Sequence, residues 1–154
     1  MEIVRIDNQK KDYLPILLLA DEQENMIDLY LERGTLYVLK DPDVKAACVV
    51  TDEGGGILEL KNIAVLPDSR RQGYGSKLVA FLSDTYQGQY TILQVGTGDS
   101  PLTIPFYQSC GFQRSHIVKK FFTSHYDHPI FEGGKQLVDM VLSLIHISEP
   151  TRPY

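Results

Sequence analysis

The chain has 154 residues, 43% of them hydrophobic, and a formal net charge of -5. This length suits one domain with its own core, and the acidic balance argues against a nucleic-acid partner, which needs a clustered basic face. No apolar run reaches the roughly 18 residues that a membrane span needs, so we predict a cytoplasmic protein without membrane association. The cysteines Cys48 and Cys110 lack CxxC spacing and are interpreted as reduced, buried thiols.

The first half of the chain has the pattern of a strand, a helical stretch and a meander. A short strand is predicted at 2–6, and residues 11–32 carry apolar side chains at helical spacing up to a stop at Gly34. Three β-type runs follow, at 35–40, 45–51 and 57–66. The segments between these runs, "DPDV" and "DEGGG", contain turn-forming residues that favour antiparallel hairpins.

The second half alternates between helices and strands. A helix is predicted at 74–86, where the apolar positions share one face, followed by a buried strand at 90–95 and a short helix within 102–112. Two late strands are predicted at 116–122 and 135–142. The order of elements predicts one α/β domain in which helices flank a mixed sheet.

The segment "VLPDSRRQGYGSKLV" joins the strand that ends near Val65 to the helix that begins at Tyr74. Pro67 stops ladder pairing, and the two glycines let the backbone N–H groups at the helix start face an anion. The helix dipole and the two arginines favour phosphate. The spacing matches neither GxxxxGK[ST] nor GxGxxG, and the alternative to an anion site is a tight turn with solvated arginines.

This loop resembles the acetyl-CoA-binding motif of the GNAT superfamily of N-acetyltransferases, in its small bacterial type. The matching residues are Val65, Pro67, Arg70, Gly73 and Gly75, and a second family motif, "FYQSCGF", follows at the expected distance. The resemblance implies an α/β fold with a GNAT-like mixed, mostly antiparallel central sheet, splayed middle strands and flanking helices. It also implies that residues 1–141 form a single GNAT-like domain.

Acetyl-CoA is the acetyl donor that the resemblance implies, without a metal. Its pantetheine arm would pair with the strand that ends at Val65, and its pyrophosphate would meet the amides that open the next helix. The stretch "VGTGDS" would allow the arm to approach closely, although Asp99 stands where family members often carry asparagine. The residues expected to bind the cofactor are Ile63, Ala64, Val65, Arg70, Arg71, Gln72, Gly73, Tyr74, Gly75, Ser76, Thr97 and Ser100.

The resemblance also implies direct attack of an amine on the thioester, which requires a proton acceptor and a proton donor. Tyr107 stands in "FYQSCGF" where family members commonly carry the general acid, and its alternative role is a core aromatic. Glu59 is predicted as the base, because strand alternation would place it on one face with Ile63 and Val65. An ordinary solvated glutamate, with deprotonation through water, is the alternative.

Residues 121–134 are interpreted as a loop that faces the acceptor. Its aromatic and acidic side chains are Tyr126, Asp127, Phe131 and Glu132. They could line a site for an amine through cation–π contact and ion pairing, or pack under the last hairpin. His125 and His128 have HxxH spacing but no distant third ligand, so no metal site is expected.

The predicted function is transfer of acetyl to a primary amine on a small molecule. Acetylation of a protein lysine or N-terminus is the alternative enzymatic activity, and a non-catalytic CoA-binding sensor is the alternative outside catalysis. The expected partner is the small-molecule amine, with a homodimer left open.

The end of the chain, residues 142–154, resembles a translated sequencing adaptor and is interpreted as a non-native read-through tail. The stretch "SEPTRPY" contains two prolines and no apolar period, which predicts a loosely attached end. "LSLI" could still complete the last strand because of its apolar character.

Overall fold

The computed structural model describes residues 1–148, so the predicted loose end lies, apart from Ser148, outside the described residues. The strands are β1 (Glu2–Ile6), β2 (Thr35–Lys40), β3 (Val44–Asp52), β4 (Ile57–Val65), β5 (Ile92–Gly98), β6 (Gln113–Val118), β7 (Phe131–Glu132), β8 (Lys135–Gln136) and β9 (Met140–His146). The helices are α1 (Leu14–Leu17), α2 (Glu24–Ile27), α3 (Tyr74–Tyr86), α4 (Ile104–Ser109) and α5 (Phe121–His125), with 3-10 turns at Lys10–Tyr13 and Pro67–Ser69.

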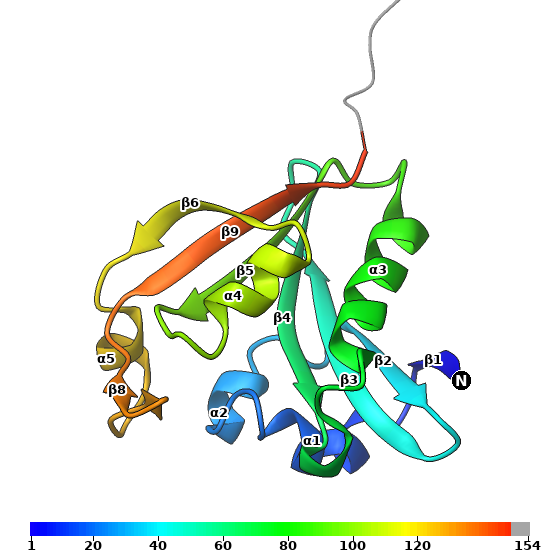
Figure 1. Ribbon diagram of the computed structural model, residues 1–154, viewed down its shortest axis with the longest axis horizontal. Helices are drawn as coiled ribbons and strands as arrows, with labels where there is room; N and C mark the ends of the chain where they lie inside the picture. Colours follow the sequence, from blue (N-terminus) through cyan, green and yellow to red (C-terminus); the bar gives the residue numbers. More distant parts are fainter. Residues whose placement is uncertain (149–154) are drawn as a thin grey trace, which may run out of the picture.

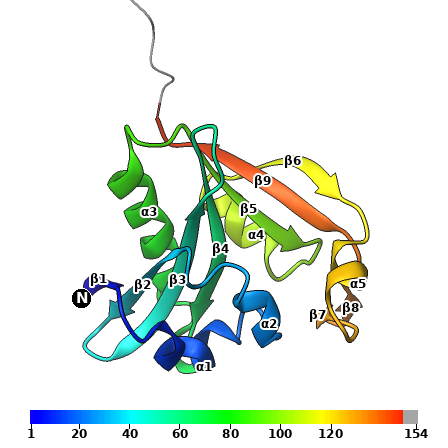
Figure 2. The same ribbon diagram turned by 180° about the vertical axis from the view of Figure 1, so that it is seen from behind.

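Seven strands form one sheet in the order β1-β2-β3-β4-β5-β9-β6 (Figure 1). The first four pair as antiparallel neighbours, which confirms the predicted meander. β4 and β5 run parallel, and β9 enters between β5 and β6, antiparallel to both. The predicted fold class, a mixed and mostly antiparallel sheet with flanking helices, is therefore confirmed. β7 and β8 form a separate hairpin near α5 (Figure 2).

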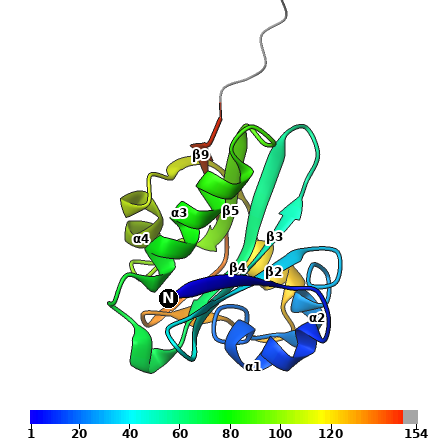
Figure 3. The same cartoon turned by 90° about the vertical axis from the view of Figure 1, so that its right-hand side faces the viewer.

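Helices cover both faces of the sheet, α3 and α4 on one and α1 and α2 on the other (Figure 3). Leu78 and Leu82 of α3 belong to a buried cluster on the first face, and Leu17 and Leu31 belong to a second cluster on the opposite face. Successive residues of β3 alternate between the two clusters, so this strand is buried on both sides. Among residues 1–148, no helix is long and apolar enough to cross a membrane.

A one-residue bulge interrupts β4 at Lys61. Val49 of β3 pairs with Asn62 and Val50 pairs with Leu60, so Lys61 has no residue opposite it. The parallel pairing of β4 with β5 also stops here, since its last pair is Leu60↔Val95. Beyond this point β4 runs away from β5 and β9, and a gap opens between them (Figure 1). The bulge in β4 therefore lies at the point where β4 diverges from β5.

Two expected elements differ from the structure. The helical stretch at 11–32 is broken into short helices, because the polar residues between α1 and α2 hydrogen-bond to a distant loop. The strand expected at 116–122 ends at Val118. Lys120 has a φ of 57°, and its backbone N–H donates to Asp139 Oδ1 at 2.8 Å, so the extended backbone ends and α5 begins.

β9 contains residues on both sides of the expected domain end at 141. Residues 142–146 pair with 92–96 of β5, and Ile147 is buried in the cluster on the α3 face. The Ser148 hydroxyl donates to the Tyr90 carbonyl. The expected boundary thus falls inside a central strand, because the apolar side chains of this segment fit the sheet. The read-through origin of 142–154 stays a prediction.

A buried lysine joins the N-terminal segment to the start of β2. The ammonium group of Lys10, whose residue is 9% exposed, donates to the carbonyls of Leu31, Glu32 and Gly34 at 3.1, 3.2 and 2.8 Å. These carbonyls lie after the end of α2. Because the helix does not continue, no N–H group of a later helical turn donates to them. Lys10 therefore satisfies backbone groups that no helical hydrogen bond reaches.

We expect Lys10→Met to lower the free energy of unfolding by about 1–3 kcal/mol, because carbonyls out of water lose their donor. Chemical denaturation measures the change. Lys11→Met is the matched control. Lys11 makes exposed ion pairs with Glu24 and Asp28, so this variant should lose clearly less free energy of unfolding. Equal losses in the two variants would contradict this role of Lys10.

Candidate active site

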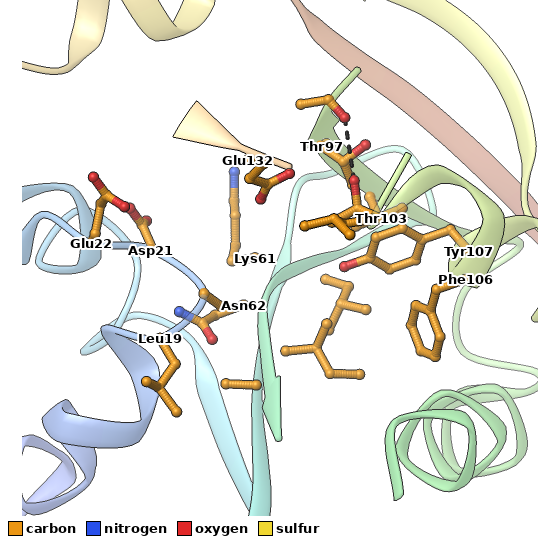
Figure 4. A pocket seen from close by; sticks show the side chains of 18 of the residues that line it. Leu19, Asp21, Glu22, Lys61, Asn62, Thr97, Thr103, Phe106, Tyr107 and Glu132 are labelled. Atoms are coloured by element: carbon orange, nitrogen blue, oxygen red, sulfur yellow. Dashed lines mark hydrogen bonds between the residues drawn. The ribbon is translucent and has the colours of Figure 1, made fainter. Parts of the chain in front are cut away.

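A cavity of about 890 Å³ lies where β4 and β5 diverge (Figure 4). Its walls come from the end of β4, the middle of β5, the start of α3, α4, the α1–α2 segment and residues 121–140. The cavity therefore joins the predicted cofactor loop to the predicted acceptor loop, which are far apart along the chain.

The start of α3 presents free backbone donors to one end of the cavity. The first hydrogen bond of the helix runs from the Lys77 N–H to the Gly73 carbonyl at 3.0 Å, so the three preceding amides have no partner within the helix. Gly73 has a φ of 83°, which favours glycine. A Cβ on Gly75 would lie 3.0 Å from the Phe106 ring, so glycine here lets α3 approach α4. Exposed Arg70 adds positive charge beside these amides.

Ten of the twelve residues predicted to bind the cofactor line this cavity. Gln72 does not line it; its side-chain amide donates to the Asp68 carbonyl at 3.4 Å. Ser100 is buried behind the wall, where its hydroxyl accepts the Leu102 N–H at 3.1 Å. The structure thus brings the other ten together, and their roles in binding stay predictions.

Tyr107 has the packing of a core aromatic and a hydroxyl that faces the cavity. Its ring is buried and makes edge contacts with Phe106 and Phe112, at centroid distances of 5.1 and 5.7 Å. Its hydroxyl points into the cavity (Figure 4). Burial, with smaller contributions from Glu132 and Cys110, raises the pKa of Tyr107 above its ordinary value. The hydroxyl therefore keeps its proton, and its role as general acid stays a prediction.

Glu59 lines the cavity but lies on a different face of β4 from the one expected. Because of the bulge, Ile63 and Val65 pack toward α3, whereas Glu59 lies on the face of its partner Thr51, toward α1 and α2. Gln94 donates to Oε1 of Glu59 at 2.5 Å, and Lys61 forms an ion pair with Oε2. Both carboxylate oxygens are therefore already engaged, and the role of Glu59 as base stays a prediction.

Three hydrogen bonds, which we call the loop bridge, join residues 21–23 to residues 126–128 at the acceptor end of the cavity. The Tyr126 hydroxyl donates to Asp21 Oδ1 at 2.6 Å, and the Asp127 N–H donates to Gln23 Oε1 at 3.1 Å. His128 Nε2 lies 3.0 Å from Glu22 Oε1. The two histidines with HxxH spacing therefore make different contacts. His128 belongs to the loop bridge, whereas His125 stacks on Phe121.

Sequence reasoning missed Asn62 and its partners. Asn62 is buried in β4, and its amide donates to the Leu17 carbonyl at 3.0 Å and to the Tyr30 hydroxyl at 3.1 Å. Tyr30 in turn donates to Asp21 at 3.0 Å, and desolvation raises the pKa of Asp21. A polar residue inside the apolar run "LKNIAV" was the signal available.

The splayed sheet, the open helix start and the tyrosine hydroxyl in the gap are the features that the resemblance to acetyl-CoA-dependent transferases implies. A family model described as acetyltransferase (GNAT) domain matches residues 32–114. The chain is 39% identical over 130 residues to the uncharacterized N-acetyltransferase YvbK of Bacillus subtilis, covering 82% of this chain and 83% of that protein. The chain therefore belongs to the GNAT family of acetyltransferases.

Solved structures agree with this assignment. A GNAT family acetyltransferase from Elizabethkingia anophelis with acetyl-CoA bound superposes with a TM-score of 0.88 at 31% identity, over 94% of this chain and 97% of that one. An acetyltransferase from Bacillus subtilis in complex with CoA gives 0.84 at 31% identity, with the same coverage. An IAA acetyltransferase from Bacillus cereus gives 0.85 at 32% identity, over 94% and 99% of the two chains.

The residues present fit acetyl-CoA. Beyond Leu60 the backbone of β4 has no partner strand on its β5 side, which suits pairing with an amide-bearing arm. Within residues 1–148, the amides of Tyr74, Gly75 and Ser76 have no hydrogen-bond acceptor at the helix start, which suits a pyrophosphate.

We expect Ser76→Asp to weaken acetyl-CoA binding at least about tenfold, because it places a negative charge among the phosphate-facing amides. Ser76 is exposed, and an acidic residue in the first turn of a helix favours the helix, so folding should survive. Calorimetry measures the affinity, with Ala80→Asp, one turn further along the exposed side of α3, as control. Equal affinity in the two variants would mean that the phosphates bind elsewhere.

Proposed function

We propose that the chain transfers acetyl from acetyl-CoA to a primary amine of a small molecule, by direct attack in a ternary complex. The loop bridge is the observation that carries the small-molecule part. It joins the α1–α2 segment to the loop after α5 at the acceptor end of the cavity. A polypeptide acceptor would need an open groove there for the chain on either side of its amine. The likeness to an IAA acetyltransferase from Bacillus cereus supports the same choice.

The chain's own groups can serve each part of the reaction. Acetyl-CoA supplies the thioester that the amine attacks. The amides at the start of α3, with Arg70 and Arg71, hold its phosphates, and the free edge of β4 orients its arm. The Tyr107 hydroxyl donates a proton to the departing sulfur.

The proposal predicts acetyl-CoA-dependent thiol release with small primary amines. A panel of alkyl and arylalkyl amines should produce turnover, while peptides that present a free N-terminus or lysine should be poorer acceptors by at least about tenfold in kcat/KM. Peptide turnover equal to the best small amine would contradict the small-molecule assignment. Acetyl-CoA binding without turnover on any amine would instead favour the sensor.

Tyr107→Phe keeps the packed ring and removes the hydroxyl. We expect the rate of single-turnover acetyl transfer to fall about 10²-fold or more, with little change in acetyl-CoA affinity. Tyr90→Phe is the matched control, because the Tyr90 hydroxyl binds Asp52 on the exposed surface. A chemical step within about threefold of wild type would return Tyr107 to a packing role only, since that difference is under about 1 kcal/mol.

A further inference from the structure

Three buried polar atoms in the cavity wall have no hydrogen-bond partner among the described residues. They are Asn62 Oδ1, Thr97 Oγ1 and Glu132 Oε2. The orientation of the Asn62 amide follows from its nitrogen, which donates to a backbone carbonyl. Buried polar atoms in folded proteins are nearly always paired, and all three of these can accept a hydrogen bond. These three atoms therefore lack donors among the described residues, and an ammonium group offers three.

Glu132 is the one of these three residues that carries a charge. It lies on β7, and its side chain turns into the cavity from the β7–β8 hairpin (Figure 4). Its carboxylate is near enough to Tyr107 to contribute to the raised pKa of that hydroxyl. Burial, with a contribution from Glu22, raises the pKa of Glu132 itself, and a hydrogen bond from Ser100 partly opposes this. The carboxylate thus lies in a site where a cation would stabilise it.

We propose that Glu132 binds the ammonium group of the acceptor and takes its first proton, opposite the Tyr107 hydroxyl in the cavity. This inference rests on the proposed function and names the residue that recognises the amine. It also explains Ser100, which the sequence suggested for the cofactor. Ser100 is buried close enough to Glu132 for its hydroxyl to lower the pKa of that carboxyl.

The proton transfers balance as follows. The ammonium gives one proton to Glu132, and the neutral nitrogen then forms the C–N bond as the C–S bond breaks. The sulfur takes a proton from Tyr107, and the second nitrogen proton restores that hydroxyl. Glu132 releases the first proton to solvent, so the sum is one amide, one thiol and one proton. Protonation of Glu132 also removes a negative charge beside Tyr107, which makes the hydroxyl a better donor.

Glu59, the carboxylate that the sequence predicted as the base, is less suited to this role. Its two oxygens already have partners in Gln94 and Lys61, and the lysine balances its charge. Glu132 Oε2 is buried and unpaired. An arriving ammonium would have to displace Lys61 to reach Glu59, whereas Glu132 Oε2 has no partner to be displaced among the described residues.

The lining of the cavity also indicates the body of the amine. Leu19, Leu29 and Phe131 are large apolar side chains that line it while remaining 46%, 64% and 58% exposed. The stacked rings of Phe122 and Tyr126 form part of the same wall. We therefore infer a primary amine with an apolar or aromatic body, whose burial would cover these side chains.

The test compares phenethylamine with 2-phenylethanol, a neutral analogue of similar shape, on the CoA-bound protein by calorimetry. Wild type should bind the amine about tenfold or more tightly than the alcohol, because a charge-assisted hydrogen bond is lost with the alcohol. Glu132→Gln should lose this preference. Asp99→Asn is the matched control: it removes the same charge beside the same hairpin, where Asp99 meets Lys135, but Asp99 does not line the cavity.

An amine preference that survives in Glu132→Gln, or that is absent from wild type, overturns the proposal. So does a preference lost in Glu59→Gln and kept in Glu132→Gln. In single-turnover transfer to phenethylamine, Glu132→Gln should be slower by about 10²-fold or more, with acetyl-CoA affinity unchanged and circular dichroism confirming the fold. If the wild-type protein binds the amine more tightly than the alcohol but transfers acetyl to no amine, the proposed function is overturned, while Glu132 remains the ammonium site.

Discussion

The divergence of β4 from β5 is the constraint on which the rest of the site depends. An extra residue, Lys61, bends β4 after its last pair with β5, and the ladder cannot continue. The free strand edge that results would be costly if it were buried without partners. The same bend opens the cavity and directs Asn62 to one side of the sheet and Ile63 to the other. The free edge of β4 and the cavity therefore share one structural cause.

The acceptor end of the cavity is built by segments that lie more than 100 residues apart. The loop bridge and the hydrogen bonds from Asn62 through Tyr30 to Asp21 form one connected network. Such a network is stable only when its members are satisfied together, because each group is partly removed from water. This explains why the short helices α1 and α2 hold their position, although four-residue helices have little stability of their own.

Two carboxylates in one cavity have opposite environments. Glu59 has a lysine and an amide at its oxygens, while Glu132 has one hydroxyl and a buried, unpaired oxygen. Neighbouring cations stabilise the ionised form of a carboxylate, whereas desolvation favours the neutral form. The two glutamates therefore differ in their surroundings: Glu59 is ion-paired, whereas Glu132 has an oxygen without a partner among the described residues.

The sequence by itself determined the cofactor half of this protein. The bounds of α3 follow from helical periodicity, and the open helix start follows from Pro67, Gly73 and Gly75, all of which act on their immediate neighbours. Tertiary structure alone decided on which face of β4 Glu59 lies. It also decided the place of β9 between β5 and β6 and the approach of Glu132 to Tyr107. A bulge shifts every later side chain to the other face, and its position depends on pairing with another strand. Local spacing cannot specify such long-range contacts, because they form only when distant segments pack.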